Sequence, residues 1–181
     1  ILLVLYIVHE NYRRDQELMK YAQTDALTGL YNKETTKLRT DEILSTDKDM
    51  IHAFLILDMD CFKQINDGYG HAVGDIVLQK FGQLLRDIFR EDDIVGRIGG
   101  DEFVVVMKNI KMKEMAIAKA EELLTKTQQY EIKELNGSAI SISIGIAMAP
   151  EDGECYMDLY KRADQALYQA KRSGKARVCG Y

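Results

Sequence analysis

The chain has 181 residues, a length that suits one domain with a sizeable core and a short appendage. A formal net charge of -5 at pH 7 and a pI near 5.3 argue against a broad basic face for binding DNA or RNA, so nucleic acid is not an expected partner. The three cysteines are odd in number and lack the spacing of a metal site, which indicates a reducing compartment.

The first eight residues, Ile1 to Val8, are all apolar, and Arg13, Arg14 and Lys20 follow them. Eight residues are too few to cross a bilayer, which takes about 20. The positive charges nevertheless match the pattern found just on the cytoplasmic side of a membrane helix. We therefore interpret residues 1–23 as the end of a transmembrane segment and a linker helix; an ordinary core or interface helix is the alternative.

An apolar heptad seam runs from Leu5 to Ala22 and is broken by Asp15. This seam fits either a signalling helix that pairs two copies of the chain or a solvated linker helix. Thr24 or Asp25 can cap the next turn, so we place the start of the domain at residue 24.

From residue 24 onward, helical and strand patterns follow one another. Asn32 can cap a helix, and Asn136-Gly137 is a strong two-residue turn signal. Hydrophobic spacing predicts helix 34–44, strand 52–58, a loop, helix 73–89, hairpin strands 93–98 and 103–107, helix 111–129, a second hairpin that continues as strand 139–149, and helix 156–172. This order predicts an α+β fold with helices packed on one largely antiparallel sheet.

The turn of the first hairpin carries two glycines followed at once by Asp101 and Glu102. Glycine supplies the positive φ angles of a tight turn, so the two acids stand at its edge. Adjacent carboxylates on a stiff turn are typical ligands of a hard cation such as Mg²⁺, although a solvated acidic turn is equally consistent with this stretch. Asp58 ends the first strand and could meet these acids if that strand pairs with the hairpin.

Six stretches of the chain resemble, in order, the sequence blocks of the GGDEF-domain diguanylate cyclases. They are residues 25–33, 58–67, 70–75, 97–103, 143–147 and 163–175. The resemblance covers residues 24–181 and implies a ferredoxin-like nucleotide-cyclase palm with extra elements. It also implies a homodimer that condenses two GTP molecules into cyclic di-GMP with release of pyrophosphate. From the apolar start of the chain and the positive charges after it, we expect this cytoplasmic domain to be attached to the inner face of a bacterial cell membrane.

The resemblance implies a catalytic centre that holds two Mg²⁺ or Mn²⁺ ions. Asp58, Asp101 or Glu102 and the backbone carbonyl of Met59 would bind the metals, with Asp101 and Glu102 as the catalytic acids. The nearby Asp60 could be an outer metal partner or a loop cap.

The same resemblance implies a GTP site. Backbone N–H groups of Cys61, Phe62 and Lys63 would face phosphate, and we interpret the Cys61 thiol itself as a packing group. Asn66 and Asp75 would read guanine, because a carboxylate accepts from the N1–H and N2–H groups that adenine lacks. His71 also belongs to the implied site. The implied phosphate-binding pair is Lys171 and Lys175, and Lys175 replaces the arginine that is usual in the family. The alternative for Asp75 and for both lysines is a charge placed near a helix end.

Arg90 and Asp93 have the Arg-x-x-Asp spacing of the family's inhibitory product site. A solvated charge cluster is the alternative. For the whole chain, the rival to an enzyme is a catalytically silent module that binds GTP or cyclic di-GMP.

Overall fold

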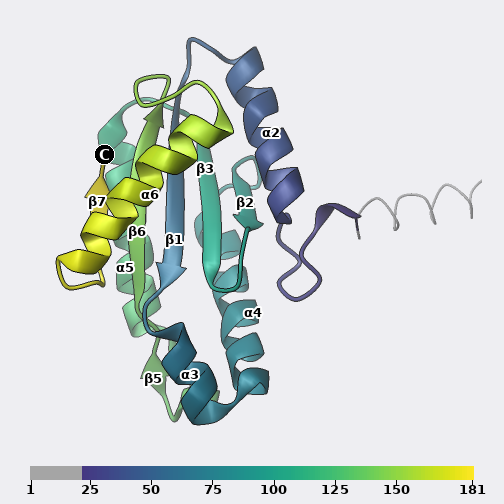
Figure 1. Cartoon of the computed structure of the whole chain (residues 1–181), viewed down its shortest axis with the longest axis vertical. Coiled ribbons are helices and arrows are strands. Elements are labelled where there is room, and N and C mark those ends of the chain that lie inside the picture. Colours follow the sequence, from purple (N-terminus) through teal and green to yellow (C-terminus); the bar gives the residue numbers. More distant parts are fainter. Residues whose placement is uncertain (1–21) are drawn as a thin grey trace, which may run out of the picture.

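The computed structural model describes residues 22–181 (Figure 1). The membrane segment and linker helix expected at residues 1–23, and the heptad seam from Leu5 to Ala22, fall almost entirely on residues 1–21, outside this part. The elements are α2 (Lys33–Thr46), β1 (Ile51–Met59), α3 (Phe62–Tyr69), α4 (His71–Ile88), β2 (Ile94–Arg97), β3 (Glu102–Ile110), α5 (Lys113–Gln129), β4 (Glu131–Ile132), a 3₁₀ turn (Lys133–Leu135), β5 (Ser138–Ala139), β6 (Ile142–Ala149), α6 (Tyr156–Arg172) and β7 (Val178–Gly180).

Five strands form the main sheet in the order β2-β3-β1-β6-β7. All neighbours are antiparallel except β6 and β7, which are parallel. The first four strands have the order of a ferredoxin-like fold, with β7 added beside β6. The predicted α+β class and largely antiparallel sheet are therefore confirmed.

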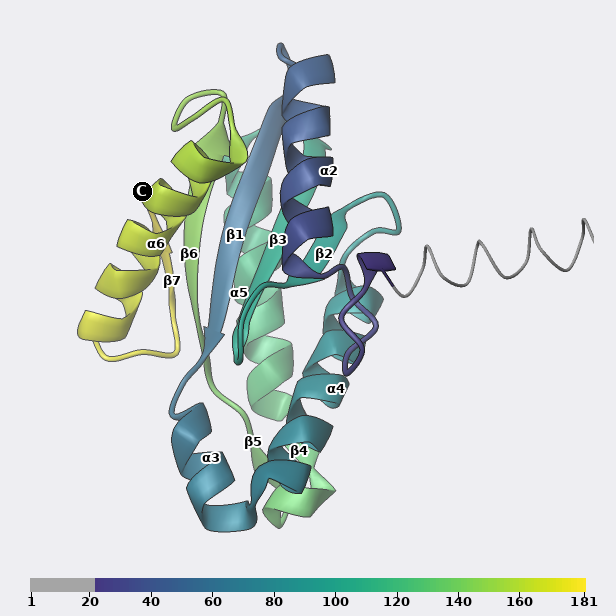
Figure 2. The ribbon, with the colours of Figure 1, turned by 45° about the vertical axis from the view of Figure 1, so that its right-hand side comes forward.

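Helices cover both faces of this sheet, with α2 and α6 on one face and α4 and α5 on the other (Figure 2). Strand β1 reads as a continuous apolar run because alternate side chains enter opposite cores. Leu55 and Leu57 pack towards α4 and α5, whereas Phe54 and Ile56 pack towards α2 and α6.

Three expectations for the elements were wrong. The predicted loop after β1 contains the short helix α3, whose sequence is poor in strong helix formers and which buries no residue fully. The second hairpin is only the pair β4 and β5, and the long strand β6 leaves it to pair with β1. The parallel edge strand β7 was not anticipated, because three residues give no usable periodicity.

The predicted cap of α2 is present and also joins the domain to the preceding helical residues. The side-chain oxygen of Asn32 accepts the N–H of Thr35 at 3.0 Å, and its amide nitrogen donates to the carbonyl of Ala22 at 2.7 Å. Asp25 caps the next turn by accepting the Thr28 N–H at 2.9 Å. Within residues 22–181, no helix has the length and apolar character needed to span a bilayer.

Gly145 on β6 is the point of closest approach between the sheet and α6. A Cβ at this position would lie 2.1 Å from the carbonyl oxygen of Ala163 and 2.4 Å from the amide nitrogen of Leu167. Both atoms belong to the backbone of α6, so a side chain could be accommodated only by moving the helix.

We therefore expect Gly145→Ala to lower the free energy of unfolding by about 3 kcal/mol, measured by urea denaturation. Gly68→Ala is the matched control, because Gly68 lies within α3 and has open space around it. Alanine is the better helix former, so the control should unfold at the parental or a slightly higher urea concentration. Equal stability of the two variants would contradict close packing of α6 on β6.

Candidate functional site

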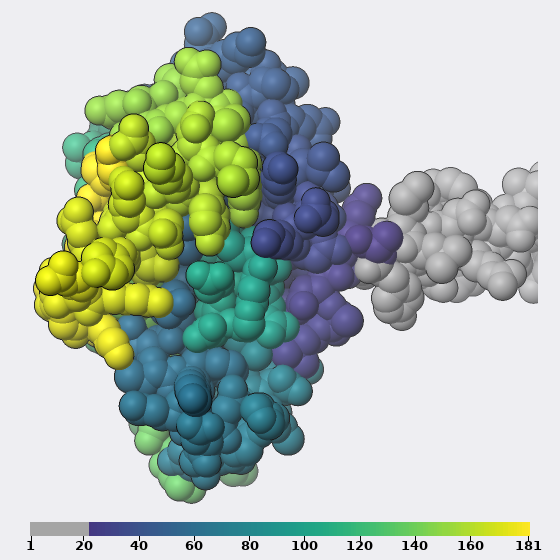
Figure 3. Space-filling model, viewed as in Figure 1, coloured from purple at the N-terminus to yellow at the C-terminus, as the bar shows by residue number. Residues whose placement is uncertain are grey.

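The predicted acids meet at one end of the sheet. Asp58 on β1 and Glu102 on β3 are direct cross-strand partners. The backbone N–H of Met59 donates to the carbonyl of Asp101 at 3.3 Å, which ties the end of β1 to the hairpin turn. In the space-filling view, the hairpin is exposed at the molecular surface, between the C-terminal end of α6 and α3 (Figure 3).

The hairpin turn is present, but neither Gly99 nor Gly100 has the expected positive φ angle, so that reason for the two glycines was wrong. Arg97 fixes the shape of this glycine turn. Its Nε and one terminal nitrogen donate to the carbonyl of Gly100 at 3.0 and 2.8 Å, and the other terminal nitrogen contacts Asp25 at 3.1 Å. Burial opposes the ionised form of Asp25, yet hydrogen bonds from Thr28 and the Arg97 guanidinium hold its pKa below the ordinary value. The sequence placed Arg97 only within a motif; this structural role was missed.

The clustered acids disfavour each other's ionised forms. Burial raises the pKa of Asp58, which the ammonium of Lys171 at 2.7 Å partly offsets. Burial also raises the pKa of Glu102, and the neighbouring charges of Asp58 and Asp101 raise it further. This edge is therefore an electrostatic site that favours a cation.

The donor set fits a hard divalent ion, because carboxylate oxygens and a backbone carbonyl are the ligands that Mg²⁺ prefers. Within residues 22–181, no three side chains of the His, Cys, Asp and Glu types already converge as a metal-binding group. The cation that contacts Asp58 is the Lys171 ammonium. The metal ligands named from the sequence remain a prediction.

The expected phosphate loop is the first turn of α3. Cys61 precedes the helix with φ 61°, and Phe62 and Lys63 are its first two residues. The first N–H groups of a helix have no acceptor within that helix, so they suit an anion. The packing interpretation of the Cys61 thiol was wrong: the residue is exposed, and the ammonium of Lys175 donates to its sulfur at 3.2 Å.

The expected base-reading residues come from the α3–α4 corner. Gly70, with φ 86°, donates its N–H to the carbonyl of Asn66 at 2.9 Å and turns the chain into α4. The side chain of Asn66 lies against Gly74, where a Cβ would stand 2.0 Å from its oxygen. The next residue, Asp75, is exposed, as is His71 at the start of α4. The fold thus places Asn66 and Asp75 on adjoining helices, and their base-reading role stays a prediction.

Asp60 contacts neither the hairpin acids nor Lys171 through a hydrogen bond described for residues 22–181. Its carboxylate accepts from the hydroxyls of Ser141 and Ser143 and from the N–H of Ala176. The sequence did not indicate these partners, because they lie more than 80 residues away.

Asp93 of the Arg-x-x-Asp pair is not a solvated charge. It is 8% exposed, and its two oxygens accept the backbone N–H groups of Arg90 at 3.0 Å and Lys108 at 3.1 Å. Arg90 is exposed on a cavity of about 750 Å³ that also borders Tyr31 and Arg86.

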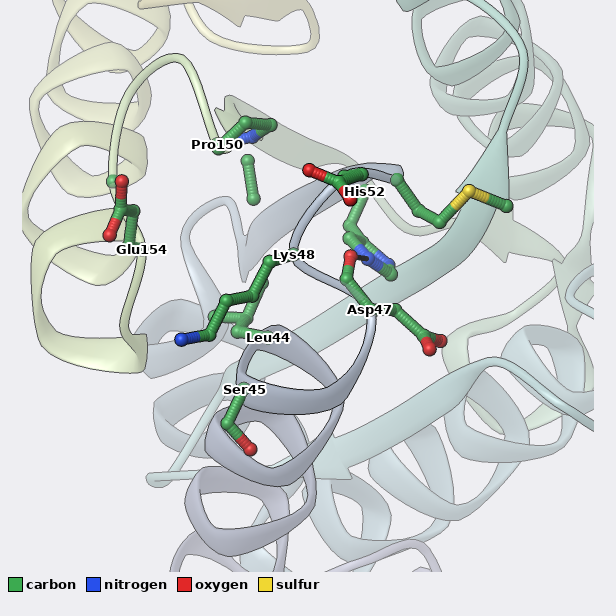
Figure 4. Close-up of a pocket in the computed structure, with 11 residues that line it drawn as sticks. Leu44, Ser45, Asp47, Lys48, His52, Pro150 and Glu154 are labelled. Carbon is green, nitrogen blue, oxygen red and sulfur yellow. Dashed lines mark hydrogen bonds between the residues drawn. The ribbon is translucent and has the colours of Figure 1, made fainter.

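A separate cavity of about 420 Å³ lies at the opposite end of the sheet (Figure 4). Its buried His52 has both ring nitrogens within 3.4 Å of backbone groups, those of Asp47 and Asn109. It contains none of the residues expected to bind GTP. A cavity of about 540 Å³ borders Glu102 and is also lined by Asp164, Tyr168, Lys171 and Arg172 among others.

Comparison with known proteins agrees with this geometry. The family model described as "Diguanylate cyclase, GGDEF domain" matches residues 22–177. Diguanylate cyclase DgcS of Shewanella oneidensis is 37% identical over 88% of this chain and 53% of its own length. Biofilm architecture maintenance protein MbaA of Vibrio cholerae is 35% identical over 96% of this chain and 23% of its own length.

The chain thus spans about half or less of these curated relatives. Among solved structures, the GGDEF domain of DgcB from Caulobacter crescentus in complex with c-di-GMP superimposes with a TM-score of 0.80. It is 27% identical, and the match covers 88% of this chain and 95% of that domain. On these matches, the chain belongs to the GGDEF-domain diguanylate cyclase family.

Proposed function

We propose that this chain is the catalytic part of a diguanylate cyclase that condenses two GTP molecules into cyclic di-GMP and releases pyrophosphate. The observation that carries the proposal is the cross-strand pairing of Asp58 with Glu102 at one end of the sheet, next to Lys171 and the start of α3. A catalytically silent binding module is the second candidate. Such a module would not need acids that repel one another at the hairpin turn, and here all of these acids are present.

The chain's own residues would divide the binding of GTP among three segments. Asp75 and Asn66 would accept and donate hydrogen bonds at the guanine edge. The first turn of α3 and Lys63 would face phosphate oxygens, and Lys171 would exchange its contact with Asp58 for the outer phosphates. Asp58, Glu102 and the Met59 carbonyl would hold Mg²⁺, which when bound polarises the α-phosphate and lowers the pKa of the attacking 3′-OH.

Glu102 is suited to remove the 3′-OH proton. We propose this role because Glu102 stands opposite Asp58 at the end of the sheet and borders the cavity beside α6. The attacking hydroxyl must come from a second GTP, because one site binds one nucleotide.

The cavity beside Glu102 is the place where a second subunit's nucleotide would enter. Tyr168 is 60% exposed there, and the guanidinium of Arg172 lies 5.7 Å from its ring. An exposed aromatic ring and an arginine suit contact with a base and its phosphates. We therefore propose a homodimer with two facing sites. From the sequence pattern of residues 1–23 we also propose that this segment pairs the subunits and attaches them to the cytoplasmic face of a membrane.

Arg90 would take part in product inhibition. Its exposed guanidinium borders the 750 Å³ cavity and can hold a guanine edge or a phosphate bidentately. Asp93 supports the turn that presents this arginine, through its contacts with two backbone N–H groups.

The chain incubated with GTP and Mg²⁺ should release pyrophosphate and cyclic di-GMP, detected by chromatography, at a specific activity that rises with protein concentration. ATP should give no product, because Asp75 would be left without donors from the base. A verified dimer that binds GTP and forms no product would favour the silent module, and equal rates with ATP would contradict base reading by Asp75.

Glu102→Gln should lower kcat by about 10²–10⁴-fold and, at neutral pH, raise the thermal midpoint of the metal-free protein. A raised folded-state pKa means that the parental protein loses stability as pH rises through that pKa. The stabilising effect of the variant should therefore be full above the folded pKa and vanish below the ordinary value of 4.5. Glu121→Gln, on the exposed side of α5, is the control and should change neither quantity. A difference in thermal midpoint that does not change with pH would show that the folded protein does not disfavour the ionised form of Glu102.

Arg90→Ala should weaken inhibition by cyclic di-GMP about tenfold or more and leave the initial rate at low product unchanged. Arg162→Ala is the control, since this arginine packs on Tyr181 away from the cavity. Unchanged affinity for cyclic di-GMP in the Arg90 variant would show that Arg90 is a solvated surface charge without a role in product inhibition.

A further inference from the structure

The side chain of Asp60 joins three segments that are far apart in the sequence. It is 9% exposed. One oxygen accepts the hydroxyl of Ser143 at 2.8 Å, and the other accepts the hydroxyl of Ser141 at 2.5 Å and the N–H of Ala176 at 3.1 Å. The carboxylate therefore links the end of β1 to the start of β6 and to the turn after α6.

The turn after α6 has an unfavourable backbone conformation. Lys175 and Ala176 are consecutive residues with φ angles of 63° and 49°, in the left-handed region where a Cβ costs free energy. Three hydrogen bonds hold this turn: the N–H of Lys175 donates to the carbonyl of Ala170 at 3.1 Å, the N–H of Ala176 donates to Asp60, and Nε of Arg177 donates to the carbonyl of Lys175 at 3.1 Å. A carboxylate is a strong acceptor for such an N–H, so Asp60, the side chain among these contacts that comes from a distant part of the chain, helps to offset the cost.

The turn brings a positive charge to the start of α3. The views in Figures 1 and 2 place the chain after α6 beside the chain between β1 and α3. The ammonium of Lys175 lies 3.2 Å from the sulfur of Cys61, the residue that precedes the first N–H groups of α3. A lysine ammonium and a helix N-terminus at one place suit a single phosphate group.

We propose that Asp60 is a positioning residue for GTP: it holds the Lys175–Ala176 turn so that Lys175 stands beside the phosphate-binding start of α3. The proposal rests on the proposed cyclase function. It assigns Asp60 no metal, because both of its oxygens are engaged by donors within the protein. The sequence left Asp60 open between an outer metal partner and a loop cap.

The two roles differ in what they require of residue 60. A positioning role needs an acceptor for the Ala176 N–H, which asparagine retains through its carbonyl oxygen while its amide donates to a serine hydroxyl. Alanine provides no acceptor. A metal ligand needs the negative charge, which asparagine and alanine both lack.

The test uses the full chain and 3′-deoxy-GTP, a probe that cannot be turned over because it lacks the attacking hydroxyl. Calorimetric titration in Mg²⁺ should show binding about tenfold or more weaker for Asp60→Ala and less than about threefold weaker for Asp60→Asn. The Mg²⁺ concentration needed for half-maximal binding should stay the same in both. Lys175→Ala should weaken binding to a similar extent and add little to Asp60→Ala, since both remove the same contact.

Asp152→Ala is the matched control. Asp152 also accepts a backbone N–H, that of Met148 at 2.6 Å, at the far end of β6, so its loss should leave probe affinity within about twofold of the parental value. Hydrogen exchange of the Ala176 amide gives a readout that does not depend on GTP, and it should become faster in Asp60→Ala alone.

Three results would overturn the proposal. Loss of Mg²⁺-dependent binding in Asp60→Asn would make the residue a metal ligand, and this outcome stays decisive if Asp60→Ala does not fold. Parental affinity in Asp60→Ala with a fast-exchanging Ala176 amide would separate the turn from GTP binding. An unchanged exchange rate would show that Asp60 does not hold the turn. Failure of the parental chain to bind the probe would instead count against the proposed function. The exchange rate of the Ala176 amide would still test whether Asp60 holds the turn.

Discussion

The repulsion between Asp58 and Glu102 is the constraint around which the site is built. Two half-buried carboxylates stand opposite each other on neighbouring strands, and each finds its ionised form disfavoured by burial. The hairpin register makes this juxtaposition unavoidable once β1 pairs with β3. Such an arrangement lowers stability unless a cation is near, and Lys171 supplies one from α6. A site that favours positive charge and presents open carboxylate oxygens is what metal-assisted phosphoryl chemistry requires.

The groups proposed to bind GTP surround this end of the sheet because three chain turns converge on it. Strand β1 delivers Asp58 and continues directly into α3, whose N-terminus would face phosphate in the proposed GTP site. The α3–α4 corner carries Asn66 and Asp75, and the turn after α6 returns Lys175 to the start of α3. Polar contacts between these turns, above all those of Asp60, hold them without enlarging the hydrophobic core.

The glycine turn is also connected to the start of the domain. Arg97 donates to the Gly100 carbonyl and pairs with Asp25, which lies just after the residues that Asn32 clamps. This chain of contacts couples the position of the turn acids to the segment that enters the domain. Charged partners of this kind hold a defined geometry because the guanidinium offers several donors in one plane.

The sequence by itself determined the elements whose signals are local. The continuous apolar run of β1, the spacing of α4 and α6, the Asn32 cap and the glycine turn each depend on residues near in the chain, and the family motifs named the acids and lysines of the site. The tertiary structure alone decided α3, β7, the exposure of Cys61 and the contacts of Asp60, Asp93 and Arg97. These depend on contacts between distant residues: Arg97 and Asp25 are 72 positions apart, and Asp60 and Ala176 are 116 apart. A hydrogen bond across such a separation leaves no periodicity in the sequence, because it exists only after the strands have paired and the helices have packed.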